Sequence, residues 1–302
     1  MFLQWCRDEL VLSFIFVQRF VSWDRTRLRK GTTAETQTLV ASGLKKILPM
    51  KNYDLLDSLT KEKIIQTVDR LGESKLTSTS HLHSLYGDKK IIEAARDYTK
   101  GYSDRARLRP ALGLIEVVLA ANRSYNLHVK PHIERIEKTT DLKTFDQLTD
   151  LIKELERAEF YKFWGHKNEK KFDVLNSILG TVTILREKYP TPKDDFDLMT
   201  NWAKNVDLKN YENDIIGQIK NVAIATMQHL RMTFGHDTVK PDQRVKEVLE
   251  KEFSQPKLNN VDTVLAVEQI ARISGLRTLE LDQVFVNYGA GYYNRTEGKY
   301  VD

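Results

Sequence analysis

The sequence predicts an all-α protein, and three of its features carry that prediction. Glycine and proline are scarce, with 14 and 7 residues in a chain of 302, whereas an all-β protein needs turn residues roughly every 8–12 positions. Apolar side chains recur at the three- and four-residue spacing of an amphipathic helix along most of the chain. Patterns typical of strands are nearly absent. We therefore expect long helices joined by few tight turns.

The composition excludes several classes of protein. Hydrophobic residues make up 41% of the chain and charged residues 29%, which is typical of a soluble globular protein. The single cysteine, Cys6, excludes a disulfide scaffold, a cysteine-rich zinc site and a four-cysteine iron–sulfur cluster. The most apolar run, residues 10–17, is far shorter than the roughly 20 residues that cross a bilayer. We expect a cytoplasmic protein with no metal, metal cluster or other cofactor and no contact with a membrane.

The N-terminal part of the chain forms a predicted helical extension. Residues 1–30 have helical spacing and end in a basic run, and residues 33–72 continue helically. Residues 74–84 are polar and rich in hydroxyl groups, which is typical of a linker. The predicted domains are therefore an extension over residues 1–84 and a helical domain over residues 85–302.

The predicted domain over residues 85–302 is a succession of helices. Pro110 stands where a helix can begin, and Pro190 and Pro192 end the longest apolar pattern. The segments with helical spacing are residues 91–99, 111–123, 126–139, 144–158, 167–189, 195–205, 215–220, 224–233, 243–252, 263–274 and 280–288.

Residues 215–245 carry the most specific motif. Two predicted short helices flank residues 220–223, the second ends at Phe234-Gly235, and a loop leads to Asp242 at the start of a third helix. This layout resembles the helix-hairpin-helix of the HhH-GPD DNA glycosylase superfamily, to which endonuclease III belongs. Residues 114–126 resemble the first barrel helix of that family, and residues 281–289 resemble its last helix. The resemblance covers roughly residues 95–294, with the hairpin at about 215–235.

The resemblance implies a function in excising bases from duplex DNA. Val222 matches the central apolar residue of the hairpin, Thr226 matches a threonine of the second helix, and Asp242 matches the catalytic aspartate. The residues expected to contact DNA are Lys220, Asn221, Val222, Ala223, Thr226, Lys240 and Arg244. Asn122, Arg123 and Tyr125 are expected to probe the duplex where the base leaves, and Asn287 and Tyr288 to line the pocket.

The departures from the family pattern narrow the predicted chemistry. Asn221 and Ala223 replace the two hairpin glycines, which ease a close approach to phosphate. Ala225 stands where the family has its Schiff-base lysine, so this route offers no covalent imine. The cysteines that hold the family's iron–sulfur cluster are also missing. What remains is the pattern of a monofunctional glycosylase.

The expected reaction is hydrolysis of an N-glycosidic bond. Because positive charge develops on the sugar, a carboxylate beside the anomeric carbon stabilises it and can activate the attacking water. The base must first leave the stack, at a cost of a few kcal/mol. Asp242 is the candidate carboxylate; the alternative is that it only caps the helix that begins at Gln243.

Other interpretations of the same residues remain open. The chain could be a non-catalytic helix-hairpin-helix DNA-binding protein, or a bifunctional enzyme that uses Lys220 or Lys240. The loop at residues 122–125 could simply end a helix, and the C-terminal tyrosines could pack in the core. In each case the expected partner is double-stranded DNA, bound by a monomer at the nucleoid. Residues 1–84 would be a further DNA clamp or a scaffold that covers the barrel.

Charge is concentrated in one stretch. The whole chain has a net charge of +5. Residues 89–130 contain nine Lys and Arg and four Asp and Glu, a difference of 9 − 4 = +5. This stretch leads into the predicted base-flipping loop, and such clustering favours an electrostatic footprint for DNA.

Overall fold

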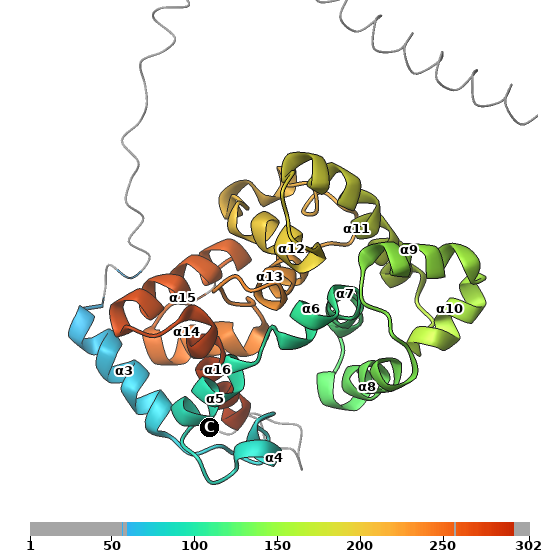
Figure 1. Ribbon diagram of the computed structural model, residues 1–302. Helices are drawn as coiled ribbons and strands as arrows, with labels where there is room; N and C mark the ends of the chain where they lie inside the picture. The colour runs from blue at the N-terminus through green and yellow to red at the C-terminus, as the bar shows by residue number, and fades with distance from the viewer. Residues whose placement is uncertain (1–55, 57–58, 257, 293–302) are drawn as a thin grey trace, which may run out of the picture. The chain divides into compact units, whose positions relative to one another are not determined.

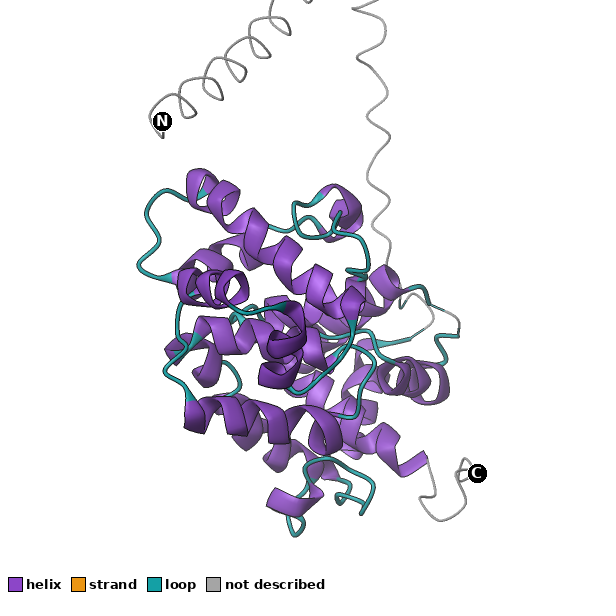
Figure 2. Ribbon diagram, turned by 90° about the vertical axis from the view of Figure 1, so that its right-hand side faces the viewer, coloured by secondary structure: helices purple, strands orange, loops and turns teal. Residues whose placement is uncertain are grey.

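The computed structural model describes residue 56, residues 59–256 and residues 258–292. The predictions for residues 1–30 and for Cys6 lie outside these residues. Within them the chain is helical, and the one strand-like contact is an isolated bridge between Lys75 and Lys90 (Figure 2). The all-α prediction is thereby confirmed. None of the helices described combines the length and apolar composition needed to cross a bilayer.

The helices follow one another with short connections (Figure 1). In chain order they are α3 (Lys61–Glu73), α4 (His83–Tyr86), α5 (Ile91–Lys100), α6 (Asp104–Leu108), α7 (Pro110–Ala120), α8 (Lys130–Thr139), α9 (Phe145–Glu154), α10 (Arg157–Trp164), α11 (Glu169–Lys188), α12 (Asp195–Lys204), α13 (Ile224–Thr233), α14 (Gln243–Phe253), α15 (Asn260–Ser274) and α16 (Thr278–Gly289). A π-helical turn, Tyr125–Val129, leads into α8, and 3-10 turns cover Leu208–Asn213 and Ala290–Tyr292.

Two predicted helices have a different structure. The segment over residues 144–158 is divided into α9 and α10, because Leu155 and Glu156 have extended backbones. The prediction of a helix over residues 215–220 is wrong, since the chain forms turns there. Asp214 Oδ1 accepts from the backbone N–H groups of Ile216 and Gly217 at 2.9 and 3.2 Å, as the N-cap of a helix does. The helical ladder does not continue, because Ile219 N donates to Ile216 O and Val222 N to Ile219 O, each three residues back.

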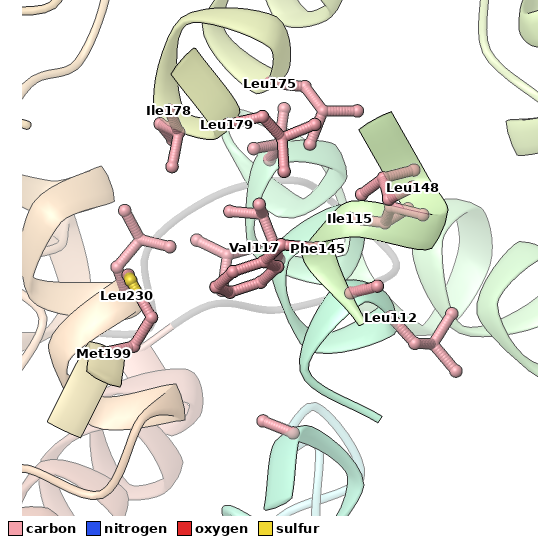
Figure 3. Packing of buried hydrophobic residues seen from close by; sticks show 14 of the residues in the cluster. Leu112, Ile115, Val117, Phe145, Leu148, Leu175, Ile178, Leu179, Met199 and Leu230 are labelled. Atoms are coloured by element: carbon pink, nitrogen blue, oxygen red, sulfur yellow. The ribbon is translucent and has the colours of Figure 1, made fainter. Parts of the chain in front are cut away.

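The buried side chains form two clusters. One is built by the consecutive elements α6 to α13, and Figure 3 shows Phe145 of α9 at its centre, among side chains of α7, α11 and α13. The other joins α3 and α5 to α14, α15 and α16. A compact unit begins at Asp54. The helix α3, which a boundary at residue 84 would assign to the extension, therefore packs in the core of the same unit.

The helix α7 lies at the centre of the first cluster. Every residue of α7 except Glu116 is buried, and the helix contacts α6, α8, α9, α11 and α13. Its approach to α6 is close at Gly113, where a Cβ atom would lie 2.6 Å from Ala106 Cβ and 3.0 Å from Ala106 Cα. The absence of a side chain at Gly113 therefore sets how closely these two helices pack.

We predict opposite effects for two glycine substitutions. Gly113→Ala should lower the free energy of unfolding by about 1–3 kcal/mol, because the new methyl group pushes α6 away from α7. Gly180→Ala is the matched control on α11, where a Cβ atom would meet nothing within 4 Å. It should raise the free energy of unfolding by about 0.5–1 kcal/mol, because alanine restricts the unfolded chain. Urea denaturation measures both, and equal shifts in one direction would contradict this account of the α6–α7 contact.

Candidate functional site

The hairpin before α13 depends on a residue with a left-handed backbone. Asn221 has φ +71°, a conformation that asparagine adopts more readily than other non-glycine residues. The next residue, Val222, is buried in the first cluster, and its N–H donates to Ile219 O at 2.9 Å. Ala223 has an extended backbone with φ −91°, which does not require glycine. The chain thus makes a tight turn without the two glycines of the family pattern.

The hairpin presents the start of α13 to the surface. Ala223 is exposed, and it is the N-cap residue, with no side-chain hydrogen bond to the helix. Its carbonyl accepts from Thr226 N and Met227 N, so the helix begins regularly. The first N–H groups of such a helix end have no partner within the helix, and together with the helix dipole they attract anions. Lys220 is exposed in the same turn.

The loop between α13 and α14, residues 235–242, is held from two sides. Asp237 accepts hydrogen bonds from the backbone N–H groups of Thr278 and Leu279, at 3.0 and 2.9 Å, at the first two residues of α16. From the other side, Gln228 Nε2 of α13 donates to Thr238 Oγ1 and to Val239 O, at 2.8 and 3.2 Å. The loop therefore has a defined position before it reaches Asp242.

Asp242 is the N-cap of α14 and is half-buried. Its Oδ1 accepts from the backbone N–H of Val245 at 3.1 Å, and its own N–H donates to Lys240 O at 2.7 Å. The capping role that the sequence allows is therefore present. The cap uses Oδ1, and a carboxylate has a second oxygen that can act on another group. Capping and catalysis by Asp242 are thus compatible.

A second carboxyl group, that of Asp282 on α16, lies close enough to Asp242 for the two charges to interact. Asp282 is 2% exposed. Its Oδ1 accepts from Lys240 N at 3.3 Å and its Oδ2 from Gln283 Nε2 at 2.8 Å. Burial, and then the negative charge of Asp242, raise the pKa of Asp282 to about 8. At neutral pH Asp282 is therefore mainly protonated.

The sequence reasoning does not single out Asp282, although a signal for it exists. The residue stands between Leu281 and Val284, on the side of α16 that the apolar spacing predicts to be buried. An acid at such a position is rare in a protein core unless it is protonated or paired. The pattern alone could not show which group it would meet.

Two cations, Lys240 and Arg244, stand two residues before and two residues after Asp242, and both are half-buried. The charge of Lys240 lowers the pKa of Asp282 against the larger effect of burial. Burial and then the charge of Arg244 lower the pKa of His81 to about 4. Both cations therefore lie near enough to the site to favour an anionic ligand beside Asp242.

The residues of the predicted base-flipping loop lie in different environments. Asn122 is exposed, with a left-handed backbone at φ +55°. Tyr125 is half-buried, and its hydroxyl donates to Glu116, which also accepts from Arg105 Nη1 at 3.0 Å through each carboxylate oxygen. Tyr125 is thus engaged inside the protein, whereas Asn122 is presented to solvent at the end of α7.

The two predicted pocket residues on α16 have partners of their own. Asn287 is fully buried, accepts from Leu82 N at 3.3 Å and donates to Gln283 O at 2.8 Å. Tyr288 accepts from Arg70 Nη1 at 3.2 Å, and Arg70 also pairs with Glu252 in the last turn of α14. Asp242 stands at the opposite end of α14. The contacts of Asn287 and Tyr288 thus join α16 to α3 and to the loop before α4.

We predict that Asp282 makes the stability of the protein fall as the pH rises. Its pKa is about 8 in the folded protein and near the ordinary value of about 3.9 in the unfolded chain. Between these values the folded state holds a proton that the unfolded state has lost, so raising the pH favours unfolding, by up to about 1.4 kcal/mol per pH unit. Asp282→Asn keeps an oxygen acceptor for Lys240 N and should remove this slope.

The measurement is the free energy of unfolding between pH 4.5 and 8, by urea denaturation. Asp150→Asn, at an exposed carboxylate of α9, is the matched control and should leave the slope unchanged. Identical slopes for the wild type and Asp282→Asn would show that Asp282 is ionised in the folded protein.

The chain matches no protein-family model, no curated protein and no solved structure. The resemblance to helix-hairpin-helix glycosylases is therefore supported only by the motif residues of this sequence. Their geometry provides an uncapped helix start after a tight hairpin, followed by a fixed loop. At the end of that loop the half-buried carboxylate of Asp242 lies near the buried carboxyl group of Asp282, and Lys240 and Arg244 stand two residues from it in the chain.

Proposed function

We propose that this protein is a monofunctional DNA glycosylase that hydrolyses the N-glycosidic bond of a damaged or modified base flipped out of duplex DNA. The observation that carries the proposal is the setting of Asp242. Its carboxylate is half-buried at the end of a fixed loop, and α13 joins that loop to a hairpin suited to phosphate. A fixed negative charge is what a sugar with developing positive charge requires.

The carboxyl pair supports the assignment of roles. Because Asp282 is buried and mainly protonated at neutral pH, it does not supply the negative charge that the reaction needs. Asp242 is also the more exposed member, so it is the one that substrate and water can reach. In the proposed reaction Asp242 stabilises the oxocarbenium-like sugar and takes a proton from the attacking water.

The hairpin supports the choice of DNA as the partner. The first N–H groups of α13 would bind a backbone phosphate, as helix starts do in many phosphate sites. Lys220, Lys240 and Arg244 would add the positive charge that holds a duplex. One copy of the chain would carry both the hairpin and the carboxylate. The proposed protein is therefore a monomer that acts on double-stranded DNA at the nucleoid.

A second candidate function is that of a non-catalytic DNA-binding protein. The observations that favour it are the cap formed by Asp242 and the internal contacts of Tyr125 and Asn287, which engage three predicted site residues in the fold. A bifunctional enzyme is a weaker alternative, because Ala225 provides no amine and Lys220 or Lys240 would have to form the imine. Borohydride trapping of the protein on DNA would reveal such an imine.

We predict that Asp242→Asn lowers the rate of base release at least about a hundredfold, in line with the loss of a transition-state charge partner. Asparagine caps helices about as well as aspartate, so the fold and the affinity for DNA should remain. The assay is mass spectrometry of bases released from damaged, modified and viral genomic DNAs.

Asp194→Asn is the matched control for this substitution. Asp194 is an exposed N-cap of α12 that accepts from Asp197 N at 2.8 Å, and it should leave base release unchanged. Failure of the wild type to release a base from any of these DNAs would favour the non-catalytic function. Unfolding of Asp242→Asn would show that the carboxylate is needed for the fold.

The hairpin gives a separate prediction for DNA binding. Ala223→Glu places a negative charge at the start of α13, where it opposes a phosphate but suits the helix dipole. Duplex affinity should fall about tenfold or more, while the melting temperature stays equal or rises. Asn176→Glu, which adds the same charge at an exposed position of α11, is the control. Equal affinities of the two variants in fluorescence anisotropy would contradict phosphate binding at the hairpin.

A further inference from the structure

Four basic side chains gather near the end of α7. Arg123 follows α7, His132 lies on α8, His166 follows α10 and Lys171 lies in the first turn of α11. The helices that carry them contact one another: α7 packs against α8 and α11, and α8 packs against α10. All four side chains are half-buried. We call these four residues the basic cluster.

Two hydrogen bonds and one close packing contact fix the position of the basic cluster. Lys171 Nζ donates to Leu119 O and Ala121 O, at 2.7 and 2.6 Å, and so holds the last carbonyl groups of α7. On the other side the ring of His132 lies against Gly165, because a Cβ atom there would be 2.1 Å from His132 Nδ1. The cluster is therefore packed into the fold and is not a set of freely extended surface side chains.

The positive charges of the basic cluster are not neutralised by acids. In the part of the chain that the structure describes, none of the four residues has a carboxylate within ion-pair distance. Burial and then the charge of Arg123 lower the pKa of Lys171 to about 8. The same two causes, burial being the larger, lower the pKa of His166 to about 4. A bound anion would therefore stabilise the charged forms of these side chains.

One atom of the basic cluster lacks a hydrogen-bond acceptor. Arg123 Nη1 is buried from solvent and has no hydrogen-bond acceptor among the described residues. A buried donor left without an acceptor costs free energy, and such groups in native proteins usually have a partner or a role. An anion in contact with Arg123 would supply the acceptor and would also reduce the repulsion between Arg123 and Lys171.

We propose that the basic cluster of Arg123, His132, His166 and Lys171 binds a phosphate group, contributed by the DNA backbone beside the loop at Asn122. The assignment to DNA rests on the proposed function. Arginine and lysine are the usual partners of phosphate, which offers several acceptor oxygens at once. Asn122 immediately precedes Arg123 and is exposed, so a duplex that meets this loop would bring its backbone to the cluster. Arg123 thus contacts the DNA backbone and does not fill the gap left by the base.

The first test uses the salt dependence of duplex binding. A plot of log K against log salt concentration has a negative slope, and each lost phosphate contact reduces the magnitude of that slope by about 0.9. Arg123→Gln should show this decrease and leaves the Lys171 hydrogen bonds in place, so it does not remove the cap of α7. Lys171→Met should show it as well. Lys170→Met, at the exposed neighbouring position, is the control for a lost charge and should retain the larger slope.

The second test uses inorganic phosphate as the probe, with the histidine ring signals followed by NMR. Phosphate should raise the pKa of His166 in the wild type and not in Arg123→Gln, and an unmodified duplex should compete with it. Phosphate binding that the duplex does not displace would overturn the assignment to DNA and leave a site for free phosphate. Absence of any phosphate effect together with unchanged salt slopes would overturn the site itself. Neither measurement depends on base release, so the site can fail or hold independently of the proposed catalysis.

Discussion

Asp237 places both oxygens of its carboxylate against the first two backbone N–H groups of α16, at 3.0 and 2.9 Å. A charged acceptor at a helix start satisfies donors that the helix cannot satisfy and interacts favourably with its dipole. The loop that carries Asp237 follows α13, which contributes Met227 and Leu230 to the first cluster of buried residues and Ile224 to the second. The contact of Asp237 therefore fixes this loop against α16, which belongs to the second cluster. A second contact between the loop and α16, from Lys240 N to Asp282 Oδ1, lies two residues before Asp242.

A polar network behind this loop explains how the position of Asp242 is maintained. Arg231 of α13 is 4% exposed, donates through Nε to Ala203 O at 2.9 Å and through Nη1 to Gln228 Oε1 at 2.6 Å. Gln228 in turn donates to Thr238, which donates to Glu268 of α15 at 2.9 Å. Buried networks of this kind hold one geometry because each member that loses its partner costs free energy. The loop that carries the candidate catalytic group therefore has little freedom, which suits preorganised electrostatic stabilisation.

The helices could be predicted from the sequence far better than the site. The helix α13 begins and ends where the apolar spacing places it, because local spacing and burial agree there. The turns over residues 215–220 could not be predicted in the same way, since they depend on a tertiary contact: a Cβ atom at Gly217 would lie 1.9 Å from Tyr211 O. The position of Asp242 at a helix start follows from local pattern, but the approach of Asp282 requires the tertiary packing of α16. The sequence does not show which residues will pair over such a distance. It shows only that a residue of an unexpected type, here an acid, stands on the buried face of a helix.

The structure shows how the basic side chains of residues 89–130 are used. Several of them pair within the fold: Lys89 and Lys100 pair with Asp97, and Lys90 pairs with Glu73.

Arginines of the stretch are engaged as well. Arg105 pairs with Glu116, and Arg109 donates to carbonyl groups that include Leu142 O and Glu137 O. Charge that is already paired attracts DNA less than the residue count suggests, because the pair is nearly neutral at a distance. Among the described residues, Arg123 has no acid partner, and Lys220 of the hairpin likewise forms no ion pair. Electrostatic attraction for a duplex thus depends less on the stretch as a whole than on the few cations that the fold leaves without carboxylates.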